Sequence, residues 1–91
     1  MKLFTLSLNL YDMPTILRKL GFRFHFFSKE NNEPPHVHVN KGKGRGKYWL
    51  EPVKKEYMKN FTKQDEKRAD KIVREEQDNF KSKWYDFFGG K

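Results

Sequence analysis

The sequence contains no cysteine, so disulfide bonds, thiolate nucleophiles, cysteine-ligated zinc sites and iron–sulfur clusters are excluded. It also has no long apolar run, and none approaches the roughly 20 residues that a membrane-spanning helix needs. Hydrophobic residues make up only 35% of the 91 residues, which is little for a globular core. A chain of this length has room for one small domain.

Aromatic residues compensate for the small apolar fraction. Nine Phe, four Tyr and two Trp make up 16% of the chain. Each ring can bury roughly 150–250 Å² of surface, so these side chains suffice for a small core. We therefore expect a folded domain of modest stability rather than a disordered chain.

Positive charge dominates the polar residues. Lys and Arg number 20 against 12 Asp and Glu, which gives a formal net charge of +8. A charge of this size favours a polyanionic partner, such as RNA, DNA or an acidic protein. The alternative is a solvated basic surface with no specific anion.

The first twelve residues resemble a signal peptide only superficially. Lys2 provides a basic start, but Thr5, Ser7 and Asn9 interrupt the apolar stretch, and no small-residue cleavage site follows. The alternation of leucine with polar residues predicts a short strand instead. We expect residues 1–12 to form an extension and the protein to be cytoplasmic, without a membrane partner.

Four further segments have the period-two pattern of half-buried strands: 15–20, 22–28, 36–39 and 47–51. Residues 29–35 contain two adjacent prolines and predict a loop. Residues 41–46 (KGKGRG) alternate glycine with positive charge and predict a hairpin connection. Pro52 is expected to end the last strand.

After Pro52 the apolar residues recur at helical spacing. Thr62, with an acid three residues later, is typical of a helix N-cap, and Gly89-Gly90 is a natural stop. One unbroken helix over 63–87 would be about 37 Å long, so we expect a bend near Gln77-Asp78. The predicted buried stripe comprises Ala69, Ile72, Val73, Phe80, Trp84 and Phe87 or Phe88.

Together these elements predict an α+β fold. A small curled antiparallel sheet of three to five strands would pack against a C-terminal helix or helix pair. The helical layer would cover the sheet face that carries Phe22, Phe24 and Phe26. We expect residues 13–89 to form a single domain, followed by a short tail at 90–91.

The opposite face of the sheet is the expected site of chemistry. Antiparallel pairing of strands 22–28 and 36–40 would place Arg23 and His25 beside His36 and His38 on one water-accessible surface. Histidine suits proton transfer near neutral pH. The two histidines of the second strand could therefore supply the base and acid of metal-independent RNA cleavage.

Three other interpretations of this face compete with catalysis. The cations Arg23, Lys41, Lys43, Arg45 and Lys47 could hold phosphates while Trp49 or His25 stacks on bases. His36 and His38, at i and i+2, could bind a metal with Glu33 or Glu51. No complete ligand signature is present, however, so no metal or other cofactor is assigned. In the simplest alternative, both rings hydrogen-bond to loop backbone near Pro34-Pro35.

Several short motifs together resemble the domain-of-unknown-function 4160 family of small prokaryotic proteins. The most specific are EPPHVHV at 33–39 and WLEPV at 49–53. The others are MPT at 13–15, LR at 17–18, GFRF at 21–24 with Phe26, Ser28 and Glu30, and the C-terminal Phe80, Trp84 and Phe88-Gly89.

The resemblance implies a role as well as a fold. Members of this family are often encoded beside a second small family, domain-of-unknown-function 2442, in what resembles a type II toxin–antitoxin module. It implies a toxin-like protein that acts on RNA or the translation machinery and is neutralised by that small partner. Glu33, His36 and His38 become the candidate catalytic residues. The alternative is a non-catalytic nucleic-acid-binding or adaptor module, and either role allows a homo-oligomer.

Overall fold

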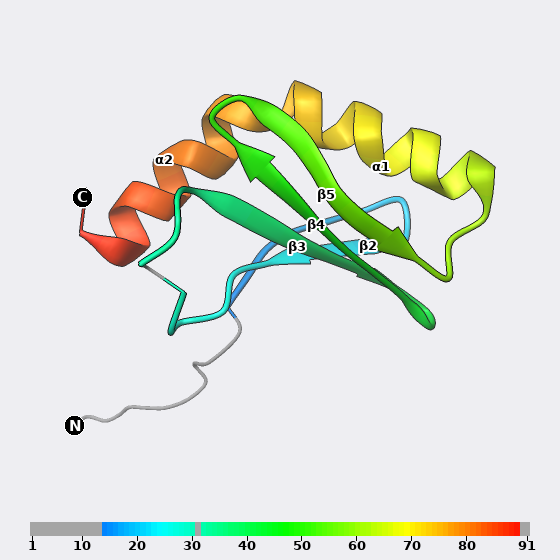
Figure 1. Ribbon diagram of the computed structural model, residues 1–91, viewed down its shortest axis with the longest axis horizontal. Helices are drawn as coiled ribbons and strands as arrows, with labels where there is room; N and C mark the ends of the chain where they lie inside the picture. Colours follow the sequence, from blue (N-terminus) through cyan, green and yellow to red (C-terminus); the bar gives the residue numbers. More distant parts are fainter. Residues whose placement is uncertain (1–13, 31, 90–91) are drawn as a thin grey trace.

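The computed structural model describes residues 14–30 and 32–89, so the strand expected within residues 1–12 lies outside the described part. Five strands form one antiparallel sheet in which the spatial order follows the sequence order (Figure 1). The strands are β1 (Thr15–Lys19), β2 (Phe22–His25), β3 (His36–Lys41), β4 (Gly44–Leu50) and β5 (Val53–Lys59).

Two C-terminal helices, α1 (Lys63–Glu75) and α2 (Gln77–Phe88), cover one face of the sheet (Figure 1). The break at Glu76 lies one residue before the predicted bend. The core between the layers is largely aromatic, as expected, and the α+β prediction is confirmed. The buried apolar residues of this core are Phe22, Phe24, Phe26, Val37, Val39, Tyr48, Leu50, Ala69, Ile72, Val73, Phe80 and Trp84.

Local sequence signals fix the ends of the helical segment. The hydroxyl of Thr62 accepts a hydrogen bond from the backbone N–H of Asp65 at 3.0 Å, which satisfies one donor of the first turn of α1. At the other end, Gly89 has φ +88°, and its N–H donates to the carbonyl of Tyr85. Glycine reaches this left-handed conformation at little cost, so α2 stops there.

The strand β5 was not predicted. Pro52 was expected to end the sheet, but the chain turns at 51–52 and returns along β4. Three charged residues in a row, Lys54 to Glu56, hide the period-two pattern of this edge strand. Its charged side chains suit an edge, since they hinder pairing with another sheet.

Neither α1 nor α2, the two helices of the described residues, has the length and apolar character of a membrane-spanning segment.

Candidate functional site

A row of directly paired residues crosses all five strands on the sheet face that the helices leave open, which we call the outer face. The register pairs Arg18 with Arg23, Arg23 with Asn40, Asn40 with Arg45, and Arg45 with Lys59. Directly opposite residues have Cβ atoms about 4.5–5.5 Å apart and point to the same side. We call these five residues the cationic row, because four of them carry positive charge.

The cationic row concentrates like charge. Among residues 14–30 and 32–89, no ion pair involves Arg18, Arg45 or Lys59. Partial burial and the charge of Arg18 lower the pKa of Arg23, whose Nε donates to the hydroxyl of Thr15 at 2.7 Å. Facing cations destabilise a sheet, so an anion bound here would relieve their repulsion.

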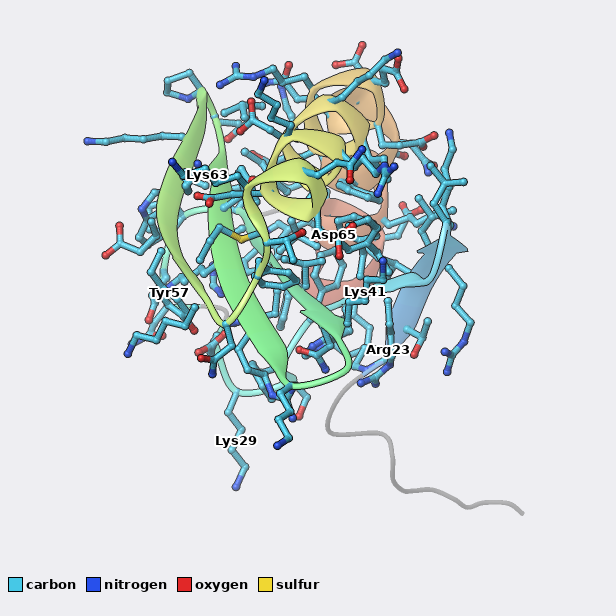
Figure 2. The ribbon with its side chains drawn as sticks, turned by 90° about the vertical axis from the view of Figure 1, so that its right-hand side faces the viewer. Arg23, Lys29, Lys41, Tyr57, Lys63 and Asp65 are labelled. Atoms are coloured by element: carbon cyan, nitrogen blue, oxygen red, sulfur yellow. The ribbon has the colours of Figure 1, made fainter. Side chains whose placement is uncertain are left out.

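Lys41 does not belong to this surface, which corrects its predicted place beside Arg23. Its neighbour Asn40 points outward, so Lys41 points to the helical side, where its ammonium is 3.0 Å from a carboxylate oxygen of Asp65. Figure 2 shows Lys41 and Asp65 close together and Arg23 farther from α1. Lys41 therefore joins β3 to the first turn of α1. Lys43 is exposed in the β3–β4 turn.

Lys47 and Trp49 lie on the outer face, as predicted, and are already engaged with neighbours. The ammonium of Lys47 is 2.8 Å from Glu33 Oε1 and 4.4 Å from the centre of the Trp49 ring. The indole N–H donates to Glu56 at 2.7 Å. Trp49 also lines a shallow groove of about 190 Å³, together with Pro34, Pro35, Glu51, Pro52 and Lys54.

The three histidines do lie on the same side of the sheet as Arg23, but they are not on a water-accessible surface. His36 is 0% exposed, His25 1% and His38 7%. Phe27, which follows β2, packs against two of the rings, with centroid distances of 5.1 Å to His25 and 4.4 Å to His38. The prediction of open imidazoles ready to meet a substrate is therefore wrong, because the sequence pattern did not show that neighbouring side chains cover this end of the sheet.

One carboxylate joins two of these buried rings. Glu30 Oε1 is 2.7 Å from Nε2 of His36 and 2.7 Å from Nε2 of His38. The predicted acid, Glu33, takes a different place: its Oε1 is 3.8 Å from Nδ1 of His36 and bonds Lys47. Nδ1 of His36 also donates to the carbonyl of Pro34 at 2.9 Å, so the simplest alternative, which expected such a bond from both rings, is met by His36, whereas His38 contacts the Glu30 side chain. Glu30, His36 and His38 form the one group within residues 14–30 and 32–89 whose ligand atoms could together hold a metal ion.

The surroundings of His38, Glu30 and His25 lower the pKa values of all three groups. Burial lowers the pKa of His38, against the opposing effect of Glu30. Burial raises the pKa of Glu30, but its contacts with the rings of His36 and His38 outweigh this effect, and the net pKa is lowered. His25 has its pKa lowered to about 4 by burial and by the charge of Arg23.

The sequence matches the family model described as Domain of unknown function (DUF4160) over residues 21–85, which is most of the domain. The chain belongs to this family. The match includes all three histidines, Glu30 and β2 to β5. No curated protein and no solved structure matches the sequence.

Two parts of the site were missed by sequence reasoning. Arg18 and Lys59 complete the cationic row, but Lys59 lies in the unpredicted strand and Arg18 needed the pairing register of β1. Glu30 lies in the 29–35 loop, where proximity to the histidines depends on the path of the loop. Its spacing of six residues before His36 gave no periodic signal.

Proposed function

We propose that this protein binds RNA through the cationic row, as the toxin-like member of a type II toxin–antitoxin pair. The observation that carries the binding role is the cationic row itself, in which Arg18 pairs with Arg23 and Arg45 pairs with Lys59, with Asn40 between the two pairs. Phosphates supply the charge that would relieve their repulsion, and phosphate contacts dominate the affinity of proteins for nucleic acids. The toxin-like role is supported by the family resemblance described above.

The groove beside Trp49 supports single-stranded RNA as the target. An indole ring and three prolines are among the residues that line it, and its volume of about 190 Å³ is of the size that a base can enter. Base–aromatic stacking contributes about 1–3 kcal/mol per base and depends little on sequence. We therefore expect backbone contacts along the cationic row and one base at Trp49.

The binding test compares two triple variants with the same loss of charge. Arg18, Arg45 and Lys59→Ala removes three cations from the row, whereas Lys63, Lys67 and Lys71→Ala removes three exposed cations from α1. Affinity for a fluorescent single-stranded RNA should fall at least tenfold more in the row variant. Equal losses would mean that net charge alone holds RNA, and the proposed surface would be wrong.

The cellular test uses the same variants. Expression of the wild-type protein alone should arrest growth, and co-expression of the domain-of-unknown-function 2442 partner should restore it. The row variant should lose the arrest and the α1 variant should keep it. Normal growth with the wild-type protein expressed alone would contradict the toxin-like role, whereas RNA binding is measured independently.

A further inference from the structure

The buried cluster at the start of β3 contains a donor and acceptor mismatch. A backbone carbonyl can only accept, so Nδ1 of His36 must carry a hydrogen to bond Pro34. In a neutral imidazole the other nitrogen, Nε2, then holds a lone pair. That lone pair points at Glu30 Oε1, 2.7 Å away, which is also an acceptor when ionised.

A cation between these atoms resolves the mismatch. One candidate is a second proton on His36, which would pair with Glu30, but it would place an imidazolium ring at a position with 0% exposure, where loss of hydration opposes the attraction. The other candidate is a metal ion, for which Nε2 of His36, Nε2 of His38 and Oε1 of Glu30 supply three ligand atoms within 4.8 Å of one another. The position of His38 also favours a metal, because its Nε2 and the Nε2 of His36 converge on the same oxygen of Glu30.

We propose that Glu30, His36 and His38 bind one divalent first-row transition-metal ion, with Zn²⁺ as its representative. Two imidazoles and one carboxylate suit such ions, whereas Mg²⁺ and Ca²⁺ prefer oxygen ligands alone. The hydrogen bond from His36 to Pro34 has the form that orients metal-bound histidines, in which the remaining ring N–H donates to a backbone carbonyl.

Binding of an ion would require movement of the Glu30 carboxylate, because its Oε1 is 2.7 Å from each Nε2. Bonds of about 2.0–2.2 Å place the ligands of a tetrahedral Zn²⁺ about 3.3 Å apart. The His36 ring packs against two indoles, with centroid distances of 5.4 Å to Trp49 and 4.9 Å to Trp84. Glu30 is on a loop with 28% of its side chain exposed. Movement of this carboxylate away from the two rings would make room for the ion.

The first experiment is calorimetric titration of the full chain with Zn²⁺. We expect one ion per chain, a higher melting temperature with Zn²⁺, and reversal by a chelator. Glu30→Gln should weaken binding by more than about 100-fold, beyond the loss typical of a second-shell partner. The control Glu75→Gln alters an exposed carboxylate of α1, which pairs with Lys71, and should bind within about threefold of wild type.

The second experiment uses the wild-type chain, so it tests the proposal even if Glu30→Gln fails to fold. The chain has three histidines, so His25 is an internal control for ¹⁵N spectra of the rings. Zn²⁺ should shift Nε2 of His36 and His38 and leave His25 nearly unchanged. No saturable binding, binding unaffected by Glu30→Gln, or a response at His25 alone would overturn the proposal. RNA binding by the cationic row uses other residues, so either proposal can fail without the other.

Discussion

At the residue scale, Lys41 shows how a cation that looks available for RNA can be used to hold the fold. Side chains along β3 alternate between the two faces, and Lys41 lies on the helical face, with its Nζ 3.0 Å from Asp65 Oδ2. Arg68 adds a second cation 3.1 Å from the same carboxylate. Hydrogen bonds from Lys41, against a smaller opposing effect of burial, lower the pKa of Asp65.

Because of this lowered pKa, the free energy of unfolding depends on pH. A carboxyl group with a lowered folded-state pKa stabilises the protein above its ordinary pKa of about 3.9, and that contribution is lost as the pH falls through the folded-state value. We expect Asp65→Asn to lower the free energy of unfolding at pH 7 and to have little effect at strongly acid pH. Urea titrations across this range measure both values. Asp86→Asn, at an exposed position, is the control, and a pH-independent effect of Asp65→Asn would contradict the account.

At the scale of elements, the hairpin of β3 and β4 depends on a missing side chain. A Cβ placed on Gly44 would lie 2.5 Å from the Phe61 ring, with two further ring atoms within 2.8 Å. The ring packs against Phe22 with a centroid distance of 6.3 Å, so it cannot move freely. Gly44→Ala should therefore destabilise the protein by about 1–3 kcal/mol.

Chemical denaturation measures this loss, and Lys43→Ala, one residue earlier in the exposed turn, is the control. If both variants unfold at the wild-type denaturant concentration, the close approach of Phe61 has no energetic consequence and this view of the hairpin is wrong.

The helix α2 is anchored by Trp84. Its ring is 5.2 Å from Phe26, 4.9 Å from His36 and 4.2 Å from Phe88, measured between centroids. Trp84→Ala should cost about 3–5 kcal/mol, a large part of the stability of so small a domain. Phe87→Ala, with 45% of the residue exposed, should cost less than about 1 kcal/mol. Thermal unfolding of both variants tests the contrast, and equal losses would show that Trp84 is not the anchor.

The same elements show how far the sequence predicts this fold. Phe22, Phe24 and Phe26 repeat with period two, and Thr62 and Gly89 have specific local roles, so the sheet face and the helix ends could be predicted. The strand β5 could not be, because an edge strand with charges on consecutive residues has no clear period. For the histidines, the sequence predicted the correct face of the sheet but the wrong exposure, because alternation along a strand does not show which side chains cover that face.

At the scale of the whole molecule, the cations on the two faces of the sheet have different surroundings. On the helical side, Lys19, Lys41 and Lys55 make ion pairs with α1 or the residue that follows it. On the outer face, the cationic row places Arg18, Arg45 and Lys59 away from carboxylates in the described structure. The proposed RNA surface is therefore the face on which these three cations lie in one row without a carboxylate partner among the described residues.

The most direct test of this account is the salt dependence of RNA binding. For single strands, the logarithm of the binding constant falls with the logarithm of salt concentration by about 0.7 for each phosphate contact. Removing Arg18, Arg45 and Lys59 should make that slope shallower by about two, whereas removing Lys63, Lys67 and Lys71 should leave it unchanged. A slope that changes equally in both variants, or a wild-type protein whose binding is independent of salt, would contradict the account.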